Sequence, residues 1–500
     1  MNNTFLCTKT SPLVETVQGP VRGYRDNGLD IFKGIPYGQA KRFHAPEPVP
    51  AWKEPLDVTS YGCVCPLMGM DKPNGELRVP HRYWVQDEDC LNLNVWTPAC
   101  DGAKRPVMVW LHGGGFFAGS SIEQVAYEGE NMARVGDCVV VSINHRLNIL
   151  GYLDLSEYGP EYANSGNAGG DDIVLALRWI RENIAAFGGN PDNVTVFGQS
   201  GGGAKVTTLL QTPAADGLYH RGIIMSGVIG PVLADSTGSA SECVEALLTE
   251  LGVKTVKEME TVPYSLLAAA YNKVSPALKA KGKYVGCTPC PNRFYLGDPM
   301  SNGTGFRPET VDVPLIVGTV FAEFLGFVQG ADVPVAEVLG KETAEKLLPL
   351  FHAAYPGRPD GDLLALDTIF RAPSIDYIKA RAAAGGKVYS YMFEQDFPIE
   401  GSAPAWHCAD IPFVFHNVEL VPSCHFDGAA ELEDRMFRAV MAFARTGEPG
   451  WPASTAETEQ THLFGPKDHL EVNYDHELIA ALQPLTAALM KRMQDAQIQH

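Results

Sequence analysis

Short apolar runs rich in β-branched residues recur along the chain, each flanked by glycine, proline or asparagine. They are apolar at successive positions instead of alternating with polar residues, which is typical of strands buried on both faces of a parallel sheet. The pattern predicts six such strands, at residues 106–111, 138–143, 193–197, 222–226, 314–318 and 388–393.

Helical patterns lie between these runs. In residues 171–187, five apolar residues from Ile173 to Phe187 follow one another at spacings of four and three, which marks one face of an amphipathic helix. Asp171 and Asp172 stand in its first turn, where the helix dipole favours negative charge. The chain therefore alternates between buried strands and amphipathic helices.

Alternating strands and helices predict an α/β fold, with right-handed crossovers and a mostly parallel central sheet covered by helices on both faces. No internal repeat, low-complexity segment or long polar linker divides the 500 residues. We therefore expect one catalytic domain over residues 1–500. Residues 235–385 are the richest in helical patterns and predict a helical cap or insertion beside the sheet.

Composition and charge narrow the possible partners. The chain is 45% hydrophobic and has a formal net charge of −20, from 39 Lys and Arg against 59 Asp and Glu. Such an acidic surface repels phosphate backbones and anionic lipids, so neither nucleic acid nor membrane is an expected partner. The N-terminus has no leader pattern and no apolar run approaches the ~20 residues of a membrane span. We expect a cytoplasmic protein, or a secreted one if a leader has been removed.

The 11 cysteines are an odd number, which argues against a disulfide scaffold. Cys287 and Cys290 have the spacing of a metal or redox motif, but a zinc site needs a second pair with matching spacing, and the sequence has none. A turn that contains two thiols is the favoured interpretation, and no metal site is predicted.

Ser200 lies in the pattern Gly-Gln-Ser-Gly-Gly of residues 198–202, after a predicted strand and before a helical run, residues 204–210. A sharp strand-to-helix turn strains the serine backbone and is tolerated only where neighbouring side chains are absent, as glycine allows. Such a turn raises the serine Oγ at a helix N-terminus, whose N–H groups stabilise an oxyanion. Glycine-rich phosphate loops share this pattern, so the motif alone does not decide.

A second glycine motif decides the interpretation. Residues 112–116, His-Gly-Gly-Gly-Phe, directly follow another predicted strand. A nucleophile elbow supplies one oxyanion donor from the residue after the serine, and a second segment supplies the others. Gly114, Gly115 and Gly201 fit this division and are the predicted oxyanion hole.

A serine hydroxyl needs a base to take its proton and a carboxylate to orient that base. In this fold the acid and the histidine follow the serine in the chain. The residue pattern leaves nine histidines open: His220, His352, His407, His416, His425, His462, His469, His476 and His500.

Beyond these motifs, the sequence resembles the type-B carboxylesterases, which include cholinesterases and bacterial para-nitrobenzyl esterases. The resemblance is dense in the first half and sparse from 235 to 385. The matching stretches are residues 31–52, 88–98, 107–120, 142–153, 167–203 and 407–417. It implies an α/β-hydrolase fold and hydrolysis of small to medium acyl, aryl or benzyl esters through an acyl-enzyme, without a cofactor or metal.

Carried over by position, the resemblance implies Ser200 as nucleophile, His407 as general base and Glu323 as the triad acid. Glu323 ends the pattern Gly-Thr-x-x-x-Glu of residues 318–323. The family commonly has Asp-Glu-Gly at this point, whereas Ala and Phe flank this glutamate. The alternative acids are Asp298 and Asp312.

The chain departs from the family pattern beside the serine. The family usually has Glu-Ser-Ala, and here Gln199 and Gly201 flank Ser200. Loss of the carboxylate removes a negative charge beside the site. A protonated histidine ring is then less stabilised, and any preference for cationic substrates is reduced. His145 stands where the family often has tyrosine, and we expect it to pack at the base of the site.

Other matches imply structural contacts. By resemblance Arg42 pairs with Glu88, and Arg146 pairs with Asp172. The family often has a disulfide at the position of Cys65 and Cys90, which in a reducing cytosol would stay as two thiols.

Two other functions compete with the esterase hypothesis. One is a lipase, which would respond to micelles or emulsions. The other is an adhesion module, since some relatives of the family keep the fold but lose the triad, whereas all three triad positions are filled here.

We expect a small-molecule ester as the partner and a monomer or weak homo-oligomer.

Overall fold

The computed structural model describes residues 5–9, 12–69, 79–229, 239–324, 334–399 and 402–485. Its main element is an 11-stranded sheet. In spatial order the strands are β16 (His469–Val472), β15 (Gln460–Phe464), β14 (Val388–Phe393), β13 (Leu315–Val320), β12 (Arg221–Met225), β11 (Gly189–Gln199), β9 (Arg105–Leu111), β10 (Val139–Ile143), β8 (Asn92–Thr97), β4 (Leu29–Pro36) and β3 (Tyr24–Asp26). All six predicted strands are among them.

The middle of this sheet is parallel. Neighbouring strands from β10 through β15 all pair in parallel, whereas β16, β8, β4 and β3 pair antiparallel. The parallel strands are buried nearly throughout, as the unbroken apolar runs predict. The predicted mostly parallel α/β sheet is thus confirmed. Two small sheets lie outside it, formed by β1 (Leu13–Glu15), β2 (Pro20–Arg22) and β7 (Leu56–Asp57), and by β5 (Gly38–Gln39) and β6 (Glu47–Pro48).

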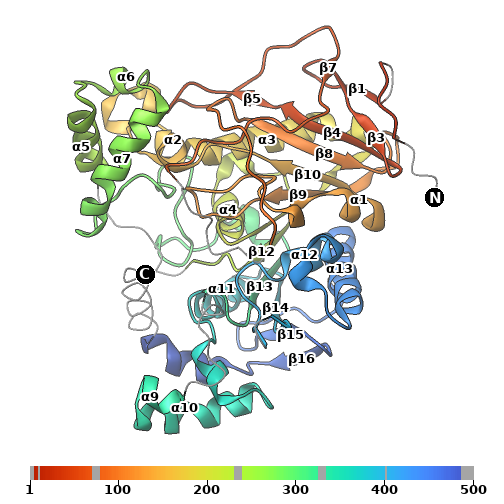
Figure 1. Ribbon diagram of the computed structural model, residues 1–500, viewed down its shortest axis with the longest axis vertical. Helices are drawn as coiled ribbons and strands as arrows, with labels where there is room; N and C mark the ends of the chain where they lie inside the picture. The colour runs from red at the N-terminus through yellow and green to blue at the C-terminus, as the bar shows by residue number, and fades with distance from the viewer. Residues whose placement is uncertain are drawn as a thin grey trace.

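Helices cover both faces of the sheet. Alternate residues of β9 enter two separate apolar cores: Val107 and Val109 pack with α3 (Ala168–Asn183), while Met108 and Trp110 pack in the core that contains the apolar face of α13 (Ala429–Thr446). Strand side chains alternate between faces, so these cores lie on opposite sides of the sheet (Figure 1). The remaining helices around the sheet are α1 (Glu130–Gly136), α2 (Asn148–Tyr152), α4 (Gly201–Leu210), α11 (Arg371–Ala383) and α12 (Ile411–Phe415).

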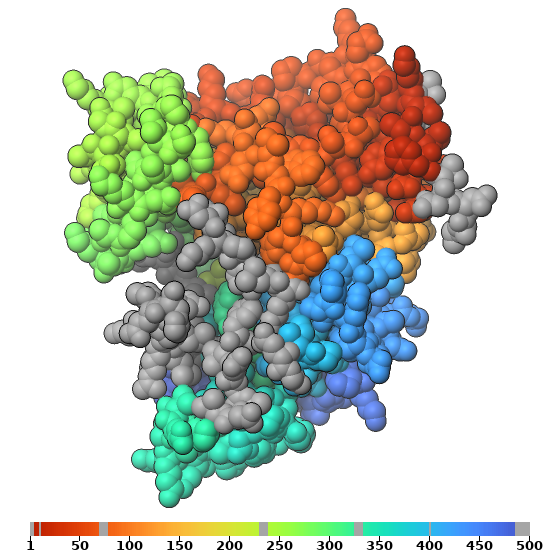
Figure 2. Space-filling view, viewed as in Figure 1, coloured from red at the N-terminus to blue at the C-terminus, as the bar shows by residue number. Residues whose placement is uncertain are grey.

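Within the helix-rich stretch 235–385, α11 packs on β13 and β14 of the central sheet, and five other helices form two groups. One group contains α5 (Ser241–Leu251), α6 (Val256–Met259) and α7 (Tyr264–Lys279), and the other contains α9 (Val335–Leu339) and α10 (Lys341–Ala354). The short α8 (Pro308–Val311) lies between the two groups in the sequence. Figures 1 and 2 show the two groups as separate parts of the molecule, green and teal respectively. Strand β13 of the central sheet also lies within this stretch, so the action of residues 235–385 as one cap stays a prediction.

Two ion pairs expected from the resemblance are formed. Arg146 and Asp172 are both buried, with Nη2 at 2.6 Å from Oδ1 and Nε at 2.9 Å from Oδ2. The Arg42 Nε donates to the Glu88 carboxylate over 2.9 Å. Arg146 also donates to the His44 carbonyl over 2.7 Å, so this pair fixes a loop against α3.

A third charged cluster is buried near the edge of the sheet that β15 and β16 form. The Arg371 guanidinium at the start of α11 donates to Glu459 over 2.7 and 2.8 Å and to Asp475 over 2.7 Å on both of its oxygens. Glu459, Asp475 and His476 lie close enough to share an ion. The guanidinium pairs with both carboxylates, and His476 also contacts Glu459, so the cluster is a structural ion network.

No helix within the described ranges has the length and hydropathy to cross a membrane.

Replacement of Arg371 by methionine should lower the free energy of unfolding by about 3–5 kcal/mol, because two buried carboxylates lose their counter-ion. The matched control is Arg438→Met, since Arg438 pairs with Asp434 on the exposed face of α13 and its loss should cost less than about 1 kcal/mol. Urea denaturation measures both. Equal decreases in the free energy of unfolding for the two variants would contradict the assigned role of the buried network.

Candidate active site

Ser200 lies between β11 and α4 in a strained backbone conformation. Its φ is 57° and its ψ is −126°, in a region that residues with a side chain rarely adopt. The Ser200 N–H donates to the Met225 carbonyl over 2.8 Å, and its carbonyl accepts from Ala204 N–H over 3.0 Å. The sheet and the helix together hold the predicted elbow.

Glycines on both sides of Ser200 are required by close backbone contacts. A Cβ on Gly198 would lie 2.5 Å from the Leu111 carbonyl oxygen, and one on Gly202 would lie 2.0 Å from that same atom. A Cβ on Gly201 would lie 2.2 Å from the Gly115 carbonyl oxygen. No side chain fits at these distances, so the elbow packs directly on the backbone that follows β9.

The segment after β9 contains the other predicted oxyanion donors. Gly114 and Gly115 have φ values of 84° and 64°, which glycine adopts without strain. A Cβ on Gly113 would lie 3.5 Å from the Cβ of Ser200, and Gly115 contacts Gly201. The structure therefore brings Gly114, Gly115 and Gly201 together beside the serine.

Glu323 and His407 meet at the same edge of the sheet. Glu323 follows β13 with a φ of 44°, is fully buried, and contacts the His407 Nδ1 through Oε2. Its Oε1 accepts from the Ser226 hydroxyl over 2.5 Å and from the Val320 N–H over 3.0 Å. The His407 N–H donates to the Glu323 carbonyl over 3.0 Å. The carboxylate is thus fixed on one ring nitrogen of the imidazole.

The alternative acids lie elsewhere. Asp298 and Asp312 are exposed, and Asp298 accepts from the Ser301 hydroxyl over 2.9 Å. Among the three acids that the sequence left open, Glu323 is the one in contact with His407.

Gln199 links the imidazole to the elbow. Its Nε2 lies 3.3 Å from both ring nitrogens of His407, and its Oε1 accepts from the Cys408 thiol over 3.0 Å. Phe370 stacks on the imidazole at 5.2 Å between ring centroids, and Phe324 lies at 4.3 Å. His407 is therefore held by an amide, a carboxylate and two aromatic rings.

Two further buried carboxyl groups lie near Glu323. Burial, together with the negative charge of Glu323, raises the pKa of Asp367 and of Asp410 to about 7. Asp367 accepts the N–H groups of Ile369, Phe370 and Arg371 over 2.9 Å each, which fixes the segment that carries Phe370. The Tyr391 hydroxyl donates to Asp410 over 2.6 Å.

Known proteins that are similar to this chain are esterases and related hydrolases. A family model described as the carboxylesterase family matches residues 10–348 and 360–484. The chain is 33% identical to the para-nitrobenzyl esterase of Bacillus subtilis over 95% of this chain and 99% of the relative, and 30% identical to the phenmedipham hydrolase of Pseudarthrobacter oxydans over 91% and 95%. The chain belongs to the carboxylesterase family.

A solved structure of an esterase from the anaerobe Clostridium hathewayi, described as able to hydrolyse aliphatic aromatic polyesters, has a TM-score of 0.92 and 50% sequence identity. The match covers 96% of this chain and 99% of that one. The protein is therefore a carboxylic ester hydrolase with the α/β-hydrolase fold, as the sequence predicts.

Behind the oxyanion segment of the carboxylesterase, His145 is buried and stacks on His112 at 4.9 Å with an angle of 17°. Burial lowers the pKa of both imidazoles well below their usual range, so both are neutral near pH 7. His145 thus packs below the site, as expected.

The cysteines of the carboxylesterase that sequence analysis singled out contact polar neighbours. Cys65 and Cys90 are free, buried thiols; a hydrogen bond from Cys65, together with burial, raises the pKa of Cys90 well above its usual range. Cys287 lies 2.8 Å from the Tyr271 hydroxyl, and Cys290 donates to the Tyr284 hydroxyl over 3.0 Å. Residues 287–290 have an irregular conformation with one bend, at Thr288, so the predicted turn is not confirmed.

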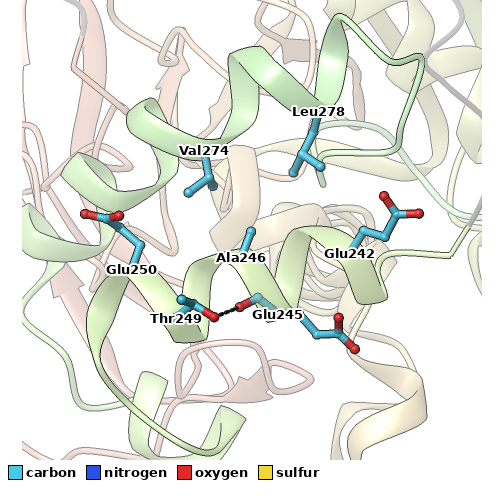
Figure 3. A pocket seen from close by; sticks show the side chains of 7 residues that line it. All are labelled: Glu242, Glu245, Ala246, Thr249, Glu250, Val274 and Leu278. Carbon is cyan, nitrogen blue, oxygen red and sulfur yellow. Dashed lines mark hydrogen bonds between the residues drawn. The ribbon is translucent and has the colours of Figure 1, made fainter.

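A groove of about 460 Å³ lies between α5 and α7 of the carboxylesterase and opens to solvent (Figure 3). Three glutamates of α5 and two apolar residues of α7 are among its lining residues, and none of the groups around Ser200 belongs to it. Its lining residues are Glu242, Glu245, Ala246, Thr249, Glu250, Val274 and Leu278.

Although alanine is usual in this family after the serine, Gly201→Ala should lower kcat of this carboxylesterase by about 10²-fold, comparable to the loss of one oxyanion donor. The added Cβ would displace Gly115. Gly102→Ala is the control, because no atom lies within 4 Å of its Cβ position. Steady-state kinetics on p-nitrophenyl acetate measures both, and unchanged kcat in Gly201→Ala would contradict the close packing.

Proposed function

We propose that the protein is a serine carboxylesterase that uses Ser200, His407 and Glu323 as a catalytic triad and forms an acyl-enzyme. The observation that carries the proposal is the buried contact between Glu323 and His407 beside the strained serine elbow. Nucleophile, base and orienting acid come from three separate segments, which makes an accidental arrangement improbable.

The position of Glu323 determines which nitrogen acts as the base. Its carboxylate holds the proton on Nδ1 of His407, which leaves the lone pair on Nε2. Nε2 takes the Ser200 proton as Oγ attacks the ester carbonyl, and Glu323 stabilises the resulting imidazolium. His407 then gives this proton to the departing alcohol.

The oxyanion of each tetrahedral intermediate is bound by the N–H groups of Gly114, Gly115 and Gly201 in this mechanism. After the alcohol has left, water attacks the acyl carbon while His407 takes a proton from it. His407 returns this proton to the Ser200 Oγ as the bond to the acyl group breaks and the carboxylic acid leaves. The steps use side chains and backbone N–H groups of the protein together with water.

Two exposed aromatic rings support aryl or benzyl esters, with small to medium acyl groups, as substrates. Phe117, in the oxyanion segment, is 52% exposed, and Phe324, beside His407, is 37% exposed. Exposed apolar side chains beside catalytic groups are typical of substrate contacts. The names of the Bacillus subtilis and Clostridium hathewayi relatives refer to aromatic esters, so aromatic ester bonds of polyesters are candidates as well.

We further infer that the enzyme acts on small-molecule esters in the cytoplasm, as a monomer or weak homo-oligomer. A reducing compartment would keep the adjacent cysteines Cys65 and Cys90 as two thiols. The net charge of −20 is unfavourable for binding to nucleic acid or to anionic membranes.

Hydrolysis of p-nitrophenyl esters from acetate to laurate tests the triad. Ser200→Ala should lower kcat by about 10⁶-fold. Glu323→Gln should lower it by about 10⁴-fold, because an amide stabilises neither the tautomer nor the imidazolium as a carboxylate does. Ser156→Ala, at an exposed serine, is the control and should keep full activity.

Full activity in Ser200→Ala would rule out this nucleophile. A rate that rises sharply when laurate or longer esters form an emulsion would favour a lipase over an esterase.

A further inference from the structure

A buried lysine lies directly behind the oxyanion segment. Lys205 is on α4, five residues after Ser200, and is 1% exposed. Its Nζ donates to the carbonyl oxygen of His112 over 2.8 Å and lies 5.9 Å from the Phe116 ring centroid. In the part of the chain that the structure describes, no carboxylate forms an ion pair with it.

An ammonium in this position is costly, because burial removes its hydration and one carbonyl replaces only one of its three hydrogen bonds. An apolar residue would fill the same space at a lower free energy. The cost indicates that the charge serves the adjacent site.

Lys205 links α4, the helix that follows Ser200, to the oxyanion segment that follows β9. His112 is the residue between β9 and the three glycines, and its carbonyl belongs to the peptide that begins the oxyanion segment. The glycines of this segment also lie close to the backbone of the elbow, as Gly115 does to Gly201. A charge-assisted hydrogen bond is shorter and stronger than a neutral one, so it restrains the orientation of the His112–Gly113 peptide.

Among the titratable groups around Lys205, the lysine itself is the cation that loses its charge near pH 7. His112 and His145 are neutral, and Glu123 and Cys65 are the other titratable groups whose charges act on Lys205. Burial lowers the pKa of Lys205 to about 7, while Glu123 and Cys65 act in the opposite direction. A lysine with a lowered pKa loses its charge as pH rises through that value, so the ammonium is present below about pH 7 and is lost above it.

We propose that Lys205 is a positioning residue for the oxyanion hole: its ammonium holds the His112–Gly113 peptide, and with it the N–H groups of Gly114 and Gly115, in the orientation that binds an oxyanion. The proposal rests on the serine mechanism above. Because the oxyanion exists only in the transition state and the intermediates, Lys205 acts on kcat and leaves KM nearly unchanged.

The test compares wild type, Lys205→Met and Lys205→Arg on p-nitrophenyl acetate from pH 5 to 9. Lys205→Met keeps an unbranched side chain, one atom shorter, and removes the charge, so kcat should fall by about 10- to 100-fold, less than the 10²–10³-fold loss of a direct donor. KM should change by less than about threefold. The inhibition constant of a trifluoromethyl ketone, which forms the oxyanion on Ser200, should rise in parallel with the loss of kcat.

The pH profile separates positioning from a merely structural role. Wild-type kcat/KM should fall on the alkaline side as Lys205 deprotonates, and this decline should be absent in Lys205→Met. Lys205→Arg keeps a cation at every pH and should remain active where the wild type declines. Lys273→Met, at an exposed lysine on α7, is the control and should reproduce the wild-type profile.

Unchanged kcat or unchanged ketone affinity in Lys205→Met would overturn the proposal, as would an alkaline decline that persists in this variant. If Lys205→Met does not fold, identical alkaline declines in wild type and Lys205→Arg would overturn it. Activity that survives Ser200→Ala would instead refute the serine mechanism, so the two failures are distinguishable.

Discussion

The structure of the site depends on one close backbone contact. Residues 198–202 of the elbow lie against residues 111–115 at distances where a Cβ would be 2.0–2.5 Å from a carbonyl oxygen. The contact is possible because β9 and β11 are parallel neighbours whose carboxyl ends reach the same edge of the sheet. It places a strained serine next to glycines with unshielded N–H groups. The proposed nucleophile and the proposed oxyanion donors are therefore positioned by the same packing, and the sheet supports the strain at Ser200.

The remaining groups of the site follow from the order of the strands. Glu323 comes after β13, and His407 comes from the segment that follows β14, so a buried carboxylate and an imidazole reach the edge where β11 ends. Ser226, after β12, completes the hydrogen bonding of this carboxylate. Gln199 stands where the family usually has a carboxylate, and its amide contacts the imidazole and accepts from the Cys408 thiol.

Much of this arrangement was predictable from local sequence patterns. Unbroken apolar runs predict the six central strands, and glycines around Ser200 and after His112 predict the elbow and the oxyanion segment. Resemblance supplied His407 and Glu323, which no periodicity could select among nine histidines and several acids. The contacts of Ser226 and Phe370 were not predicted, because each joins segments that lie far apart in the chain. The contact of Lys205 was not predicted, because in the sequence Lys205 is one more residue of a helix. The division of residues 235–385 into two helical groups depends on tertiary packing that composition does not record.

The most direct test of the account is covalent labelling with diethyl p-nitrophenyl phosphate, followed by intact-protein and peptide mass spectrometry. The account predicts one diethylphosphoryl group per chain, on Ser200, and a labelling rate that falls strongly in His407→Ala because the serine has lost its base. A label on another serine, such as Ser226, or equal labelling of wild type and His407→Ala would contradict the proposed triad.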